Sequence, residues 1–122
     1  MQVPLDDIVI YVTSLRSLRE QGTVTIFTDR HAYLQTAEFY SDLDRLDRID
    51  WRILQNRDFK RDSSDLGKVE RYQAEALVHQ HLPCAALNGI VCRNENASVR
   101  VRELAKKART DVQVLTRPSY FI

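Results

Sequence analysis

Residues 68–79 read KVERYQAEALVH, and they contain the glutamate on which the interpretation of the whole chain depends. From residue 73 onward the run is largely apolar, so it predicts a buried strand over 73–79. Because side chains alternate along a strand, Gln73 and Glu75 would point to the same face. An ionised carboxylate costs free energy in an apolar setting unless it is paired. Glu75 is therefore either a structural acid paired with an arginine or a group that faces a cleft.

The composition is typical of one globular domain. Among 122 residues, 43% are apolar, 29% are charged and the net charge is +1, which neither indicates nor excludes a nucleic-acid partner. No run approaches the roughly 20 apolar residues of a membrane span, and the N-terminus lacks the layout of a secretory signal. Cys84 and Cys92 have apolar neighbours, which favours buried free thiols over a disulfide or metal pair. These features predict a cytoplasmic protein that does not engage a membrane.

The apolar pattern predicts alternating strands and helices, and hence a mixed α/β or α+β sheet domain. Ser14 and Asp50 are expected to cap short helices, and Asn94 or Asn96 to cap the clearest helix of the chain. A helix over 30–40 would carry Tyr33, Leu34, Ala37 and Tyr40 on one face. The predicted strands cover residues 8–12, buried on both faces, and residues 23–27, 73–79, 90–92 and 112–115.

Residues 41–72 form a long charged excursion, rich in Asp and Arg, of the kind that usually signals function or disorder. Lysine and arginine for phosphates, interleaved with aromatic side chains for stacking, are what single-stranded nucleic acid requires. A solvated charged loop is the alternative, and Asp58, Asp62 and Asp65 dilute the positive field. The candidate nucleic-acid-binding residues are Arg57, Lys60, Arg61, Lys68, Arg71 and Tyr72.

Histidine and glycine patterns exclude several other chemistries. His31 follows Asp29, an expected helix cap, and could either bind a ligand or be exposed. His79 and His81 lack two further ligands at suitable spacing, so we expect no metal site. The sequence also has no nucleotide-binding glycine loop, no G-x-S-x-G and no C-x-x-C.

Three segments occur in an order that is similar to one known family. They are TDRHA at 28–32, RDF at 57–59 and K-x-E-R-x-Q-A-E-x-L-V-H at 68–79. The chain from about residue 8 onward resembles the DarT family of bacterial DNA ADP-ribosyltransferase toxins. The resemblance implies an α+β ADP-ribosyltransferase-like fold, a mixed sheet with flanking helices, in a single domain over 1–122. It also implies transfer of ADP-ribose from NAD+ to a base in single-stranded DNA, with no metal.

The resemblance assigns roles to residues of this chain. Glu75 matches the catalytic glutamate of the family, and Gln73 and His31 are candidate NAD+-binding residues. Residues 34–75 match the ADP-ribosylating turn-turn loop, which receives the DNA. A nearby carboxylate can stabilise the oxocarbenium-like ribose that forms as nicotinamide leaves and can assist deprotonation of the attacking base nitrogen.

One departure from the family pattern leaves two functions open. The chain has no H-x-T segment, and the resemblance implies that the N-terminal part of the fold, with most of the NAD+ pocket, is absent. The chain is then the catalytic-glutamate half of a toxin whose antitoxin is DarG, a macrodomain protein. The alternative is an inactive remnant that binds nucleic acid or the antitoxin. Exposed sheet edges would also favour self-association.

Overall fold

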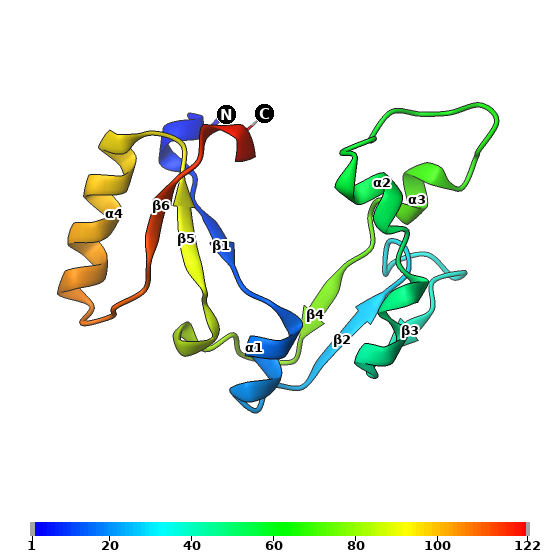
Figure 1. The fold of residues 1–122 in the computed structure, drawn as a ribbon, viewed down its shortest axis with the longest axis horizontal. Helices are drawn as coiled ribbons and strands as arrows, with labels where there is room; N and C mark the ends of the chain where they lie inside the picture. The colour runs from blue at the N-terminus through cyan, green and yellow to red at the C-terminus, as the bar shows by residue number, and fades with distance from the viewer. Residues whose placement is uncertain (1, 122) are drawn as a thin grey trace. The chain divides into compact units, whose positions relative to one another are not determined.

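The computed structural model describes residues 2–121, which fold into two compact units. The terminal unit combines residues 2–22 with residues 82–121, and the central unit is Thr23–His81. Each unit has its own three-stranded sheet (Figure 1). Helices accompany strands in both units, and the sheet of the terminal unit is mixed. The predicted α+β class is thereby confirmed.

The sheet of the terminal unit is built around β5 (Gly89–Cys92). This strand pairs antiparallel with β1 (Ile10–Val12) and parallel with β6 (Val114–Thr116). Val91 and Cys92 are buried almost completely, as expected for a β-branched central strand. The edge strand β1 was predicted to be buried on both faces, but Tyr11 is 60% exposed. The prediction was wrong: Tyr11 faces solvent, and Ile10 and Val12 on the other face are only partly buried.

Helix α4 (Glu95–Lys107) makes the crossover between the parallel strands β5 and β6. The Asn94 side chain accepts a hydrogen bond from the Ala97 amide at 2.9 Å, so the predicted cap is Asn94 and not Asn96. Lys106 and Lys107 lie in the last turn, where cations suit the helix dipole. Beyond the helix, Arg109 adopts a left-handed φ of 56°.

The remaining elements of the terminal unit are short. The Ser14 side chain accepts a hydrogen bond from the Ser17 amide at 3.0 Å, which confirms Ser14 as a helix cap. The thiol of Cys92 is buried as predicted, whereas Cys84 is exposed because it lies on a surface turn. The remaining short elements of the terminal unit are α1 (Leu15–Glu20) and the 3-10 helices η1 (Leu5–Asp7), η3 (Cys84–Ala86) and η4 (Pro118–Tyr120).

The central unit has an antiparallel sheet with β2 (Thr25–Thr28) in the middle. Its neighbours are β3 (Phe39–Tyr40) and β4 (Ala76–Val78). The charged excursion between β3 and β4 contains the 3-10 helix η2 (Leu43–Arg48), α2 (Trp51–Gln55) and α3 (Lys68–Arg71). The side chain of Asp50 accepts a hydrogen bond from the Ile53 amide and so caps α2 as predicted.

The predicted helix over 30–40 does not form. The amides of Leu34 and Ala37 donate to carbonyls three residues earlier, which makes separate turns. The Asp29 carboxylate accepts a hydrogen bond from the Glu38 amide at 3.0 Å and closes the segment as a loop. Tyr40 then enters β3, where its ring stacks on Phe27 with centroids 5.6 Å apart. Tertiary contacts therefore override a local helical period.

The predicted strand over 73–79 begins only at Ala76. The amides of Gln73 and Ala74 donate to the carbonyls of Glu70 and Arg71, so these residues continue the turn that ends α3. Glu75 lies at the junction between this turn and β4. Within residues 2–121, no helix is both long and apolar enough to cross a membrane.

Candidate active site

The backbone of Glu75 is fixed to the end of β2. Its amide donates to the Thr28 hydroxyl at 3.0 Å, and its carbonyl accepts from the Thr28 amide at 2.8 Å. Thr28 is fully buried. Two opposed hydrogen bonds to one buried residue leave the Glu75 backbone little freedom to rotate.

The carboxylate of Glu75 is fixed as well. Its Oε2 atom accepts a hydrogen bond from the Ala32 amide at 2.9 Å, and the residue as a whole is half-buried. A carboxylate that is anchored through one oxygen and reaches the surface can present its other oxygen to a ligand. The recorded contact that holds the charge is a backbone amide, whereas the structural alternative was an arginine.

The turn that carries Ala32 is itself tied to α3. The Thr28 hydroxyl donates to the Arg30 carbonyl at 2.6 Å, and the His31 amide donates to the Glu70 carbonyl at 3.2 Å. The Arg30 guanidinium lies 3.4 Å from a Glu70 carboxylate oxygen. Residues 28–32 are thus a rigid bracket around Glu75, built from the TDRHA segment that the sequence singled out.

The two candidate NAD+-binding residues differ in their surroundings. His31 is half-buried, and its Nδ1 atom accepts a hydrogen bond from the Tyr33 amide at 3.1 Å. This contact assigns the proton of a neutral imidazole to Nε2, which becomes a donor. Gln73 is exposed on the turn before Glu75. Both residues therefore lie on the segments that hold Glu75, and their role in binding stays a prediction.

The charged excursion is organised by ion pairs that link α3 to the N-cap of α2 and to the segment between the two helices. The Lys68 ammonium lies 2.7 Å from the Asp58 carboxylate, and the Lys68 side chain is only 8% exposed. The Arg71 guanidinium donates to Asp50 at 3.0 Å and makes two hydrogen bonds to Asp65. These groups line a polar pocket of about 400 Å³.

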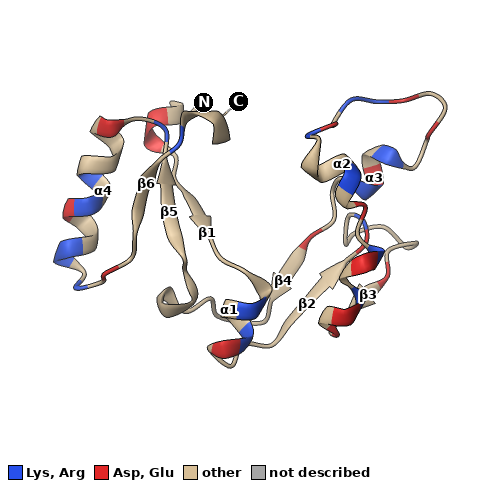
Figure 2. Cartoon of the chain, viewed as in Figure 1, with Lys and Arg blue, Asp and Glu red and all other residues tan. Residues whose placement is uncertain are grey.

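Hydrogen bonds lower the pKa values of three aspartates in the excursion. The hydrogen bond from Lys68 lowers the pKa of Asp58, and the hydrogen bonds from Arg71 lower the pKa of Asp65. Hydrogen bonds from Ser64 lower the pKa of Asp62. Sequence reasoning treated these aspartates only as a dilution of the positive field, and it missed Asp50 as a partner of Arg71. The alternation of acidic and basic residues was the available signal (Figure 2).

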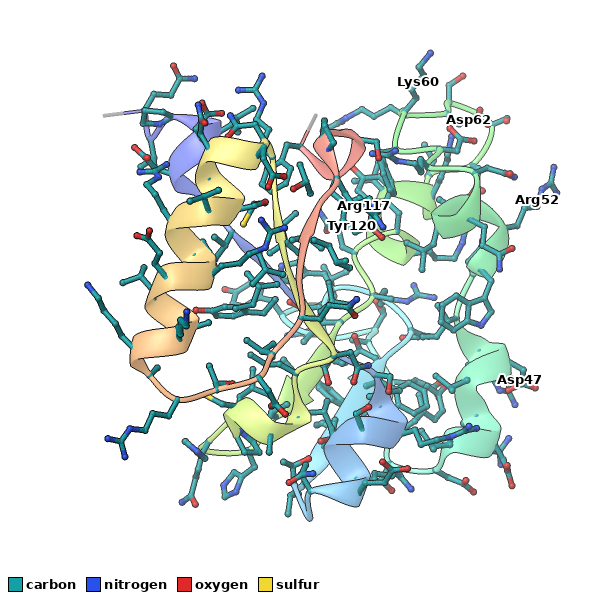
Figure 3. The ribbon with its side chains drawn as sticks, turned by 60° about the vertical axis from the view of Figure 1, so that its left-hand side comes forward. Asp47, Arg52, Lys60, Asp62, Arg117 and Tyr120 are labelled. Carbon is teal, nitrogen blue, oxygen red and sulfur yellow. The ribbon has the colours of Figure 1, made fainter. Side chains whose placement is uncertain are left out.

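The structure separates the predicted nucleic-acid-binding residues into two groups. Arg57, Lys60 and Arg61 are exposed on the excursion, and Lys60 points away from the ribbon in Figure 3. Lys68 and Arg71 are held in the ion pairs described above. Tyr72 is half-buried, with its ring edge-on to the partly exposed Phe59 at a centroid distance of 5.3 Å.

The arrangement combines one anchored carboxylate with a neighbouring loop that carries exposed cations. In the described part of the chain, no cluster of His, Cys, Asp and Glu side chains could hold a metal ion. A single anchored carboxylate suits a developing positive charge on a ribose. The neighbouring loop with exposed cations suits a phosphate backbone.

Known proteins are similar to this chain in sequence and in fold. The chain matches over residues 1–122 the family described as "ssDNA thymidine ADP-ribosyltransferase, DarT". A protein of Escherichia coli O127:H6 named "DNA ADP-ribosyl transferase" is 42% identical over 118 residues, which is 97% of this chain and 54% of that protein. The chain therefore spans about half the length of this relative.

Two solved structures of Thermus sp. 2.9 DarT have the same fold. The complex with carba-NAD+ superposes with a TM-score of 0.89 at 24% identity, covering 100% of this chain and 62% of that one. The complex with ADP-ribosylated single-stranded DNA superposes with a TM-score of 0.86 at 24% identity, covering 96% of this chain and 56% of that one. Because the family match extends over both units, the chain belongs to the DarT family.

Proposed function

We propose that this protein is a DNA ADP-ribosyltransferase that transfers ADP-ribose from NAD+ to thymine in single-stranded DNA. The observation that carries the proposal is the anchored carboxylate of Glu75, whose Oε2 atom accepts from the Ala32 amide at 2.9 Å. Family membership supports the substrates, since the family is described by this activity. Thermus DarT has been captured both with an NAD+ analogue and with modified single-stranded DNA.

NAD+ supplies the ADP-ribosyl group, and its nicotinamide leaves with the electrons of the glycosidic bond. Glu75 would lie beside the ribose and stabilise the positive charge that develops on it. Thymine has one ring nitrogen that carries a proton, and this nitrogen forms the new bond to the ribose carbon. The proton is lost from the base as the bond forms, and the Glu75 carboxylate can accept it.

The segments around Glu75 supply candidates for binding NAD+. His31 offers the Nε2 donor that its contact with Tyr33 defines. Gln73 offers an exposed amide two residues before Glu75, where it could reach a ribose hydroxyl. Both would orient the sugar and not react with it.

The excursion would receive the acceptor strand. Exposed Arg57, Lys60 and Arg61 fit contacts to phosphates. The rings of Tyr72 and Phe59 offer a surface on which a base can stack. In the proposed setting the protein acts in the cytoplasm as the toxin of a toxin-antitoxin pair, and a DarG-type macrodomain protein reverses the modification. Self-association remains part of this proposal.

The proposal is tested with NAD+ labelled in the adenylate. We expect label to enter single-stranded oligonucleotides that contain thymine and not matched oligonucleotides in which cytosine replaces thymine. Equal label in both would show that transfer does not require thymine and would contradict the proposed acceptor. Salt-sensitive binding of single strands without transfer would instead support the second function, a nucleic-acid-binding module without catalysis.

A further inference from the structure

The strongest unexplained feature of the central unit is the set of ion pairs that closes the excursion between α2 and α3. Six basic or aromatic residues there fit DNA binding by residue type alone. Their surroundings differ, however, and the difference separates groups that can meet a phosphate from groups that hold the loop.

The loop of residues 56–67, which connects α2 to α3, leaves α2 with a backbone that is fixed by hydrogen bonds. After α2, the amide of Arg57 donates to the Leu54 carbonyl and the amide of Asp58 donates to the Ile53 carbonyl. Arg57 adopts a left-handed φ of 52°. This is the hydrogen-bond pattern of a Schellman motif, and it aims Asp58 back toward α3.

Lys68 forms an ion pair with the Asp58 carboxylate. Its side chain is 8% exposed, and its ammonium lies 2.7 Å from Asp58. An unpaired ammonium at this burial would be costly, and the Asp58 carboxylate compensates its charge. The contact joins the first residues of the loop to the first residue of α3.

Arg71 joins the other parts of the loop. Its planar guanidinium bridges Asp50, which caps α2, and Asp65, which lies just before α3. Gly67 leaves room for this fork, because a Cβ atom there would lie 3.0 Å from the Arg71 Nη1 atom. The charges of Asp58 and Asp65 are therefore compensated inside the loop by Lys68 and Arg71.

We infer that Lys68 and Arg71 are positioning residues, which hold residues 56–67 in the shape that presents Lys60 and Arg61 to the phosphates of the acceptor strand. The ion pairs with Asp50, Asp58 and Asp65 form a clasp at the base of the loop. The inference rests on the proposed function only in naming the ligand of the loop as single-stranded DNA.

The direction in which one substitution changes the affinity for DNA distinguishes a positioning role from direct phosphate contact. Asp65→Asn removes a negative charge and weakens the hold on Arg71. If Arg71 bound phosphate, this change would free the cation and tighten binding of a thymine oligonucleotide. A positioning role predicts weaker binding, by several-fold at low salt. Asp62→Asn is the matched control: Asp62 bonds Ser64 outside the clasp, and its neutralisation should leave binding equal or tighter.

The salt dependence of binding gives a second readout. Each phosphate contact to a single strand contributes about 0.7 to the slope of log affinity against log salt. Lys60→Ala should reduce the slope by about this amount. Arg71→Lys should weaken binding while the slope stays that of the wild type. A reduced slope for Arg71→Gln together with tighter binding by Asp65→Asn would overturn the inference.

Limited trypsin digestion tests the clasp without DNA. Cleavage after Lys60 and Arg61 should be several-fold faster in Asp65→Asn and Arg71→Lys than in the wild type and in Asp62→Asn. Equal cleavage rates would contradict the positioning role. A wild-type chain that binds no single-stranded DNA but shows the faster cleavage in the variants would refute the proposed ligand and leave the clasp established.

Discussion

Glu75 and Ala32 are joined by a hydrogen bond of 2.9 Å from a backbone amide to a carboxylate oxygen, although 43 positions separate them in the chain. The contact holds the acid that the sequence analysis proposes as catalytic, and it is made by the segment that starts at buried Thr28. Positioning of a reacting group by a rigid frame is a large part of catalysis.

The hydroxyl of Thr28 is expected to matter for activity. Thr28→Val keeps the shape of the side chain but removes the acceptor for the Glu75 amide and the donor to the Arg30 carbonyl. We expect kcat for transfer to fall by roughly 10- to 100-fold with a smaller change in KM, since misplacement of a reacting group reduces the rate of the chemical step.

Thr28→Ser is the matched control for this change, because it keeps the hydroxyl and loses only a methyl group. Both variants should lose about 1–2 kcal/mol of unfolding free energy, one from an unsatisfied amide and one from a small cavity. Thermal unfolding followed by circular dichroism checks this equivalence. Equal rates for the two variants would rule out a role for the hydroxyl in positioning Glu75.

Acid should open the excursion before it unfolds the rest of the chain. The pKa values of Asp58 and Asp65 are lower in the folded protein than in an unfolded chain. Their ion pairs therefore contribute stability above the unfolded pKa of about 4, and this stability is lost as the pH falls through the lower folded pKa values. Amide hydrogen exchange over residues 56–67 should become less protected below about pH 4, relative to exchange in β5.

The double variant Asp58→Asn, Asp65→Asn provides the comparison. Its excursion should already be weakly protected at pH 6, with a smaller further loss in acid. If the variant and the wild type lose protection in parallel as the pH falls, other carboxylates account for the effect.

Arg109 is expected to cost stability where it stands. It has a left-handed φ of 56°, and its amide and that of Thr110 donate to the carbonyls of Lys106 and Ala105 at the end of α4. A residue with a Cβ atom is disfavoured in this conformation, whereas glycine is not. Arg109→Gly should raise the unfolding free energy by about 1 kcal/mol and Tm by a few degrees.

Ala108 gives the control for this prediction, since it is the neighbouring residue with an ordinary helical φ of −78°. Ala108→Gly should lower Tm, because glycine gains nothing there and loses backbone entropy on folding. A decrease in Tm for both variants would show that the Arg109 side chain stabilises the helix end more than its backbone conformation costs.

The sequence predicted best those features that depend on a few neighbouring residues. Ser14, Asp50 and Asn94 cap helices because each side chain reaches an amide three residues ahead. The helix expected over 30–40 failed because Asp29 binds the Glu38 amide and Tyr40 pairs in a strand. The apolar residues of 30–40 have helical spacing, but the pairing of β2 with β3 determines the conformation of the segment.

The site shows the same division between local and distant information. Glu75 was found from its motif, yet its apolar surroundings wrongly placed it inside a strand. Its contact with Ala32 could not be predicted, because no local pattern indicates which amide meets a carboxylate 43 positions away. The pairing of Arg71 with Asp50 spans 21 positions, and residue type alone made Arg71 resemble a phosphate ligand.

We propose that the negative charge of Glu75 is required for transfer, because it stabilises the positive charge that develops on the ribose. Glu75→Gln keeps the size of the side chain and an oxygen that can accept from the Ala32 amide, so it removes the charge and preserves the fold. The most direct measurement is the mass of a thymine-containing single-stranded oligonucleotide after incubation with NAD+ and either protein. We predict a gain of one ADP-ribose with the wild type and no gain with Glu75→Gln. Equal modification by both proteins would contradict the assignment of Glu75 as the catalytic residue.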